Sequence, residues 1–447
     1  MQTGFSQSGT WDVRGSREAH NVASDSKVRE EKVTKRTHSI SRRNALRLTV
    51  IAAATAGVAK PGIIRMAFAQ DKTPIKIGFP VPLSGIYGDY AKDQVNGAQL
   101  AISQFNAKGG VLGRKVELLV RDDQLDVQVN SQVAKELCEN DKVDFLSGAL
   151  GESTILSMNE ASRQYKKIFF GINQSGDIFT GKNFNKYTFL EAMTPYLSVT
   201  YLARYAKEKW NPKRVFTIGP DYQWGHNNKN QWRRRTEEWG GQIVGEIIYP
   251  FKNEKYQAFM QPILDAKPDL LAAANFGDEQ VLFLKQAVAY GIQEKMPILL
   301  TLTGITPRIP AGDAAFKGVY GGTSFYWEIG KTIPTAKAFV DAFEKAYDHP
   351  PGDYGATAYS AIVNMLTATQ KVGSIDNDAI VKAVEDLHYD NYKGKQWFRP
   401  CTHQSLQDFF ILQSRPKPEG KWGYFEVVNT QHWNEKDERS CEELRGA

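Results

Sequence analysis

Hydroxyl and carboxyl side chains at expected helix starts are the residues of this 447-residue chain that best suit a binding site. Ser153-Thr154 begins a helical pattern and Ser175-Gly176 forms a turn, so both places offer donors for a ligand carboxylate. Glu279, or its neighbour Asp278, can pair with a buried ammonium group, although the helix dipole alone also favours an acid there. These residue types predict recognition of a small charged molecule.

Sequence motifs for catalysis are missing. There is no Gly-x-Ser-x-Gly nucleophile elbow, and the scattered histidines do not form a nucleophile-like arrangement. No Cys-x-x-Cys or His-x-x-His spacing offers a metal site. We therefore expect a protein that is not an enzyme and that uses neither a metal nor a cofactor.

An export signal occupies the N-terminal part of the sequence. Arg42-Arg43 precedes the short apolar run 48–59, and Ala67-Phe68-Ala69 supplies the small-x-small pattern of a cleavage site. The apolar run is too short for the roughly 20 residues that span a bilayer. We expect residues 1–69 to be a twin-arginine export signal with a long leader, cleaved near Ala69/Gln70, and the protein to work in the periplasm.

The basic charge of the chain lies in this N-terminal segment. Residues 1–69 hold 12 Lys and Arg against 5 Asp and Glu, which leaves 44 and 45 in the remainder. A nearly neutral mature protein gives no electrostatic reason to expect a nucleic-acid partner.

Three cysteines permit one disulfide with one thiol left over. Cys138 falls in a helical pattern and is expected to be a small buried residue. Cys401 and Cys441 both lie in the C-terminal region, where an oxidising compartment would allow them to pair.

The mature part alternates short apolar strands with helical patterns, which specifies parallel βαβ units. Expected strands cover 75–81, 115–120, 143–146, 168–171, 214–218, 243–248, 270–274 and 297–300. Expected helices cover 90–105, 127–139, 152–165, 196–209, 227–239, 256–266, 279–290, 335–347 and 354–371.

Two such runs, broken near Met193-Thr194-Pro195, predict two doubly wound α/β lobes with a ligand cleft between them. We expect an N-terminal lobe of residues 70–195 plus about 322–400. A C-terminal lobe and tail would comprise 196–321 plus about 401–447. The chain then crosses between the lobes more than once, which makes a hinge of several strands.

Residues after the expected strands carry three motifs in a fixed order. They are Leu83-Ser84-Gly85 with Tyr87-Gly88, then Asn-x-x-Gly-Gly-x-x-Gly-Arg at 106–114, and then Asp122-Asp123. With this combination, residues 74–430 resemble the periplasmic leucine/isoleucine/valine-binding family, which are solute-binding subunits of ABC importers with the type I periplasmic binding fold. Each motif alone would be weak evidence.

The resemblance implies a monomeric periplasmic protein that captures an amino acid or a related small polar or aromatic compound in an interlobe cleft. Such a protein delivers its ligand to an inner-membrane ABC permease. The alternative is a periplasmic receptor of the same fold that senses an amide or an aromatic acid without transport.

Matching by position, the resemblance also implies a pocket whose residues take distinct roles. We expect aromatic side chains on its walls and a loop that holds the ligand carboxylate. A carbonyl and a hydroxyl would bind the ligand's polar groups, a side chain of the second lobe would cover the cleft, and an acid would pair with the ammonium. Tyr196 would serve either hinge packing or the pocket wall. The full set is Tyr87, Leu150, Glu152, Ser153, Asn173, Ser175, Tyr196, Trp224, Glu279 and Tyr354.

Glu152 departs from the family pattern. Members that bind amino acids carry a small hydroxyl residue at this place. This chain has Glu152 there, unless an alignment gap moves Ser153 into the position. A carboxylate there would repel a ligand carboxylate. Either Glu152 points away from the cleft, or the ligand is a cationic, amide-like or larger aromatic compound. Leu125 also replaces one cysteine of the family's N-lobe disulfide.

Overall fold

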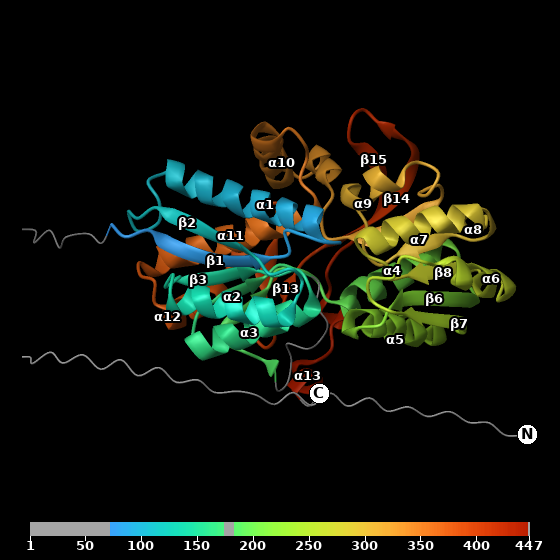
Figure 1. Ribbon diagram of the computed structural model, residues 1–447, viewed down its shortest axis with the longest axis horizontal. Helices are drawn as coiled ribbons and strands as arrows, with labels where there is room; N and C mark the ends of the chain where they lie inside the picture. The colour runs from blue at the N-terminus through green and yellow to red at the C-terminus, as the bar shows by residue number, and fades with distance from the viewer. Residues whose placement is uncertain (1–71, 174–182, 446–447) are drawn as a thin grey trace, which may run out of the picture. The chain divides into compact units, whose positions relative to one another are not determined.

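The computed structural model describes residues 72–173 and 183–445 (Figure 1). The expected export signal, residues 1–69, and the expected ligand residue Ser175 lie outside these ranges. The described chain forms two lobes, each built on a largely parallel sheet with helices on its faces. This confirms the predicted α/β fold class.

The first lobe contains a five-stranded sheet in which all neighbours are parallel. In the strand order β2-β1-β3-β4-β5, the connections lead to one side of β1 for β2 and to the other side for β3. Ligands of open α/β sheets bind at such a switch point, beyond the carboxyl ends of the strands. The strands are β1 (Ile75–Val81), β2 (Val116–Asp122), β3 (Phe145–Gly148), β4 (Phe169–Gly171) and β5 (Thr188–Leu190), and the connecting helices are α1 (Gly88–Ala107), α2 (Val127–Glu139) and α3 (Glu152–Tyr165).

The second lobe contains a seven-stranded sheet in the order β15-β14-β10-β9-β8-β6-β7. Five strands are parallel, and an antiparallel hairpin closes one edge: β6 (Arg214–Pro220), β7 (Gln242–Tyr249), β8 (Leu270–Ala273), β9 (Ile298–Leu300) and β10 (Val319–Thr323), with the hairpin β14 (Phe409–Glu419) and β15 (Gly423–Gln431). Its helices are α4 (Pro195–Lys209), α5 (Gln223–Glu238), α6 (Gln257–Asp265), α7 (Asp278–Ala289), α8 (Ile292–Lys295) and α9 (Ile305–Ala311).

Three segments of the described chain run between the two sheets: one after β5, one after β10 and one before β14. After the second crossing, α10 (Pro334–Tyr347), α11 (Asp353–Val372) and α12 (Asn377–Glu385) return to the first lobe, where α11 packs along α1 (Figure 1). A small sheet of β11 (His388–Tyr389), β12 (Gln396–Phe398) and β13 (Ser405–Leu406) lies beside β5 through a Leu190–Gln404 bridge. The lobe boundaries given above stay a prediction.

A buried ammonium group connects the crossing segments. Lys393, only 2% exposed, donates from Nζ to the Ser324 carbonyl at 2.6 Å, to the Asp408 carbonyl at 3.3 Å and to the Gln407 side chain. The Gln407 amide in turn donates to the backbone carbonyl of Glu191, next to β5. Burial lowers the pKa of Lys393 to about 7 and raises that of Glu191 to about 7.

Cys401 and Cys441 form a disulfide, and Cys138 is buried with a free thiol. The bond joins the short helix α13 (Cys441–Arg445) to the turn between β12 and β13. It therefore attaches the C-terminal segment to the small sheet near the crossings.

Helices α1 and α11 approach each other closely because glycines face one another. A Cβ on Gly97 would lie 1.9 Å from the Gly355 carbonyl oxygen. Asp93 of α1 accepts hydrogen bonds from the Gly355 and Gly352 backbone N–H groups at 2.6 and 3.2 Å, so α1 also caps the start of α11. Burial raises the pKa of Asp93 to about 6.

We predict that Gly97→Ala destabilises the protein by about 1–3 kcal/mol, because the added methyl group forces the two helices apart. In an open helix the same change would stabilise by up to about 1 kcal/mol. The matched control is Gly304→Ala, where the Cβ position is open and φ is −175°, with an expected cost below about 1 kcal/mol. Urea denaturation of both variants is the measurement, and a Gly97→Ala protein as stable as wild type would contradict the prediction.

Candidate functional site

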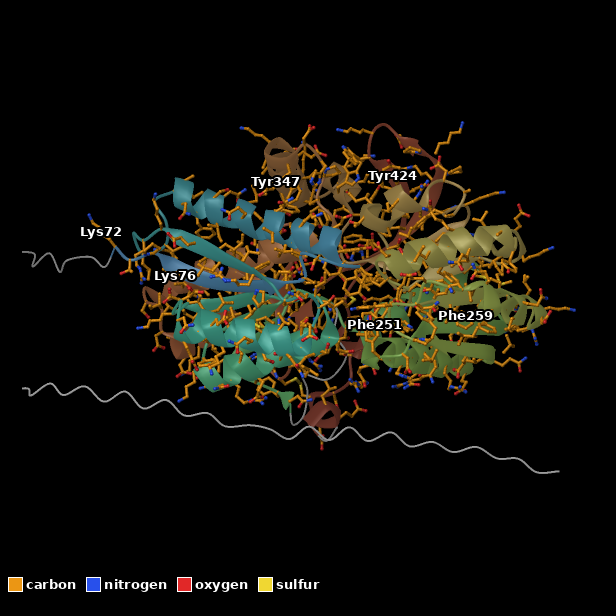
Figure 2. The ribbon with its side chains drawn as sticks, in the orientation of Figure 1. Lys72, Lys76, Phe251, Phe259, Tyr347 and Tyr424 are labelled. Carbon is orange, nitrogen blue, oxygen red and sulfur yellow. A yellow bond between two sulfur atoms is a disulfide. The ribbon has the colours of Figure 1, made fainter. Side chains whose placement is uncertain are left out.

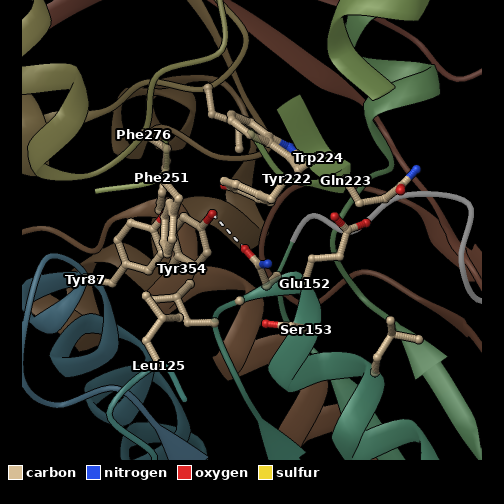
Figure 3. Close-up of a pocket in the computed structure, with 15 residues that line it drawn as sticks. Tyr87, Leu125, Glu152, Ser153, Tyr222, Gln223, Trp224, Phe251, Phe276 and Tyr354 are labelled. Carbon is tan, nitrogen blue, oxygen red and sulfur yellow. Dashed lines mark hydrogen bonds between the residues drawn. The ribbon is translucent and has the colours of Figure 1, made fainter. Parts of the chain in front are cut away.

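A cavity of about 200 Å³ lies where the carboxyl ends of strands from both lobes meet. Aromatic residues are the most numerous kind in its walls (Figure 3). In Figure 2 the lining residue Phe251 lies where the two lobes face one another, whereas Phe259 lies within the second lobe. The lining residues are Tyr87, Leu125, Leu150, Gly151, Glu152, Ser153, Leu156, Asn173, Tyr222, Gln223, Trp224, Phe251, Phe276, Leu302 and Tyr354.

The first lobe contributes residues that follow β1, β3 and β4 and residues of α11. Tyr87 immediately precedes α1, Gly151 immediately precedes α3, and Asn173 follows β4. Tyr354 lies in the first turn of α11, which Asp93 holds against α1. Tyr87, Gly151 and Tyr354 therefore take their places from the starts of helices α1, α3 and α11.

The second lobe contributes the ends of four strands. Tyr222 and Trp224 stand at the start of α5, directly after β6. Phe251, Phe276 and Leu302 follow β7, β8 and β9. Successive strand ends thus supply the aromatic and apolar wall opposite α3.

Aromatic rings from the two lobes contact one another around the cavity. Phe276 packs against Tyr87 at 5.1 Å, Tyr90 at 4.5 Å and Tyr354 at 5.5 Å, measured between ring centroids. Tyr222 and Trp224 stack at 6.1 Å with an interplanar angle of 18°. Such a continuous aromatic wall excludes water and favours a ligand with an apolar or ring-shaped body.

Polar groups gather on one side of the cavity. The Tyr354 hydroxyl donates to Asn173 Oδ1 at 3.1 Å (Figure 3). Glu152, 6% exposed, extends from the first turn of α3 toward Gln223 and Trp224 of the second lobe (Figure 3). Glu152 therefore lines the cavity and does not point away from it.

Seven of the ten expected site residues line this cavity, and all seven lie at strand ends or helix starts: Tyr87, Leu150, Glu152, Ser153, Asn173, Trp224 and Tyr354. Ligands of open α/β sheets bind just beyond the carboxyl ends of the strands, which we call the strand-end rule. The rule also covers Tyr222, Phe251 and Phe276, which sequence reasoning missed. Phe251 and Phe276 could have been found by extending the same rule to the seventh and eighth strands.

Glu279 does not line the cavity. It is 1% exposed and accepts hydrogen bonds from the Asn253 backbone N–H at 3.2 Å and the Tyr249 hydroxyl at 3.5 Å. Because α7 begins at Asp278, the Glu279 side chain turns toward the β7–α6 connection behind the aromatic wall. Burial raises its pKa to about 7. Its expected role as the ligand's ammonium partner is not supported by this position.

Tyr196 also lies away from the cavity. Its ring is surrounded by the guanidinium groups of Arg234, Arg235 and Arg439, at 5.8, 5.1 and 5.0 Å from the ring centre. Together these residues line a separate polar groove between α4, α5 and the C-terminal segment. Tyr196 therefore does not line this cavity, and its alternative role in hinge packing stays a prediction.

Within residues 72–173 and 183–445, no group of three or more His, Cys, Asp and Glu side chains could hold a metal ion. No helix in the same ranges has the length and apolar character needed to cross a membrane.

Comparison with known proteins agrees with this architecture. A family model described as "Periplasmic binding protein" matches residues 74–420. The leucine-, isoleucine-, valine-, threonine- and alanine-binding protein of Pseudomonas aeruginosa is 23% identical over 360 residues, which cover 80% of this chain and 94% of the relative.

Solved structures show the same fold. An amino acid ABC transporter substrate-binding protein from Pseudomonas fluorescens Pf-5 has a TM-score of 0.77 and 23% identity, covering 83% of this chain and 98% of that one. A solute-binding protein of an ABC transporter from Rhodopseudomonas palustris BisB5, solved with 3,4-dihydroxybenzoic acid, has a TM-score of 0.73 and 24% identity, covering 81% and 98%. The match over residues 74–420 confirms the family resemblance: the chain belongs to the periplasmic binding protein family.

Proposed function

We propose that the protein is the periplasmic solute-binding subunit of an ABC importer. It captures an amino acid or a related small polar or aromatic compound in the interlobe cavity and delivers it to an inner-membrane permease. The observation that carries this proposal is the cavity itself, whose walls come from strand ends of both lobes. A ligand held between two lobes can stabilise their closed arrangement, which a permease can recognise.

The chemistry of similar proteins supports this range of ligands. The relative from Pseudomonas aeruginosa is named for binding amino acids, and the Rhodopseudomonas palustris protein was solved with an aromatic acid. The ring-lined wall and the polar edge at Glu152, Ser153 and Asn173 suit a ligand with an apolar body and one polar end. Native mass spectrometry of protein recovered from the periplasm would identify the molecule it carries.

Transport and sensing predict different consequences of deleting the gene. A transport subunit is needed for uptake, so the deletion strain should fail to accumulate the radiolabelled ligand, and the intact gene should restore uptake. Normal uptake in the deletion strain would instead favour a ligand-sensing receptor.

The export signal gives a prediction of its own. N-terminal sequencing of periplasmic protein should start at Gln70, because cleavage follows Ala67-Phe68-Ala69. Replacing Arg42 and Arg43 together by Lys should abolish export through the twin-arginine route. The control, Arg14→Lys with Arg17→Lys, makes the same conservative change in the leader and should leave export intact. Undiminished export of the first variant would rule that route out.

Lobe closure gives a second prediction. Gly277 has φ +63°, and a Cβ there would lie 2.7 Å from the Tyr87 ring of the other lobe. Gly277→Ala should therefore oppose closure and weaken binding of the natural ligand by about 1–3 kcal/mol, or about 5- to 150-fold. Small-angle scattering should show that saturating ligand reduces the radius of gyration of the wild type, and calorimetry gives the affinities.

The matched control for Gly277→Ala is Gly373→Ala. Gly373 has a similar φ of +76°, but no atom lies within 4 Å of its Cβ position, and it ends α11 away from the cavity. This variant should bear the same backbone strain and keep the wild-type affinity. Equal affinities of all three proteins, or an unchanged scattering profile at saturation, would argue against the closing-lobe mechanism.

A further inference from the structure

We propose that the polar groove between α4, α5 and the C-terminal segment is a second binding site, which holds a phosphate-bearing anion. The groove and the interlobe cavity share none of their described lining residues. The inference therefore goes beyond the proposed capture of a solute and does not rest on it. Its grounds are the charge, the geometry and the size of the groove.

Cationic side chains outnumber acidic ones in the polar groove. Among the described residues that line it, the cations are Arg204, Lys207, Arg234, Arg235, Lys436 and Arg439. The acids are Glu238, Asp437, Glu438 and Glu443. Six cations against four acids leave a net charge of +2, even if every acid neutralises one cation of the groove. This surplus is local, because residues 70–447 hold 44 Lys and Arg against 45 Asp and Glu.

Two of the acids pair with arginines of the groove. Glu238 lies 3.0 Å from Arg234 and 2.9 Å from Arg235, so one carboxylate is shared by two guanidinium groups. Asp437 of the C-terminal segment pairs with Arg204 of α4. The Glu238 carboxylate therefore balances only half of the positive charge that α5 brings to the groove.

The other two acids have contacts with residues that do not line the groove. Glu443 accepts a hydrogen bond from the Ser440 backbone N–H at 2.7 Å, next to the start of α13. Glu438 lies 3.8 Å from the Arg399 guanidinium. Part of the negative charge in the groove is thus shared with groups outside its lining.

Three guanidinium groups gather around one ring in the groove. Arg234 and Arg235 of α5 and Arg439 of the C-terminal segment lie 5.8, 5.1 and 5.0 Å from the centre of the Tyr196 ring. Like charges held this close repel one another, and an anion between them relieves that repulsion. Guanidinium groups donate pairs of parallel N–H bonds, so an anion with several acceptor oxygens can bind to α5 and to the C-terminal segment at once.

The size and the charge of the groove favour phosphate over a simple carboxylate. Its volume is about 430 Å³, against about 200 Å³ for the interlobe cavity. A phosphate monoester carries a charge of about −1.5 to −2 at pH 7 and has three strong acceptor oxygens, which matches the surplus of +2. Free phosphate compounds carry such a group, and the headgroup of an anionic phospholipid offers the same chemistry.

The competing interpretation is an ion-pair network that only attaches the C-terminal segment. That segment is already attached by the Cys401–Cys441 disulfide and by Trp433, whose ring packs against Trp397 at 4.9 Å between centroids. A purely structural network also gains nothing from surplus cations, because additional like charges weaken it. These facts favour a site that an added anion completes.

Calorimetry at pH 7 and low ionic strength, with inorganic phosphate as the probe, tests the site. The wild-type protein should bind one phosphate with a Kd of about 1 mM or tighter, and acetate at least about tenfold more weakly at equal ionic strength. Arg234→Gln in α5 and Lys436→Gln in the C-terminal segment each remove one charge from an exposed side chain of the groove. Each variant should weaken phosphate binding about three- to tenfold.

Arg233→Gln is the matched control for Arg234→Gln. It removes the same charge one residue earlier in α5, and the two side chains are similarly exposed, at 48% and 52%. The Arg233 guanidinium, however, pairs with Glu246 of β7 at 2.6 Å and does not line the groove. Phosphate should bind this variant within about twofold of the wild-type affinity.

Sedimentation with vesicles distinguishes the two sources of the phosphate group. The vesicles contain either phosphatidylcholine alone or phosphatidylcholine with phosphatidylglycerol. Binding to the anionic vesicles that phosphate displaces and Arg234→Gln weakens would identify a lipid headgroup as the ligand. Phosphate binding without vesicle binding would identify a free phosphate compound. Both results support the site.

Several outcomes would overturn the inference. They are no heat of phosphate binding at about 10 mM, acetate binding as tight as phosphate binding, or equal weakening by Arg233→Gln and Arg234→Gln. Vesicle binding that Arg234→Gln leaves unchanged would overturn the lipid source. The ranking of phosphate and acetate by the wild type needs no variant, so it decides the matter even if a variant does not fold.

Discussion

The hydrogen bonds of one buried ammonium group hold the geometry on which the cavity depends. Lys393 connects the segment after β10 to the segment before β14, and Gln407 extends the link to the segment after β5. All three passages of the described chain between the sheets are thus tied at one place. Carbonyl acceptors offset part of the free energy cost of burying this charge, and the remaining cost lowers the pKa of Lys393 to about 7. Because the crossing segments are tied together, the strand ends of the two lobes stay close enough to form one site.

Sequence patterns predicted the positions of helices and strands better than they predicted which strands pair in the sheets. Helices at 127–139 and 152–165 have the expected bounds, because a regular apolar face specifies a helix locally. β5 has three residues and the β14–β15 hairpin follows the last expected helix, so neither was found. The hairpin completes the second sheet through pairing with β10, a contact between residues distant in sequence that periodicity cannot show.

The candidate site was predictable to the extent that it follows the strand-end rule. Tyr87, Asn173 and Trp224 follow strands and line the cavity as that rule requires. Glu279 follows a strand too, but its position on α7 points its side chain behind the aromatic wall. That direction depends on which residue begins the helix, which the sequence pattern does not specify. The fold thus belongs to the whole family, whereas recognition of a particular ligand depends on the single side chains that line its site.

Packing of Phe276 against rings of the first lobe has a kinetic consequence. Tyr87, Tyr90 and Tyr354 surround this ring, so separating the two lobes requires Phe276 to withdraw from them. If a ligand leaves by lobe opening, as proposed, its residence time includes the breaking of these contacts between protein rings. A membrane partner that pulls the lobes apart would speed release without touching the ligand, and a freely diffusing protein would retain its cargo between encounters.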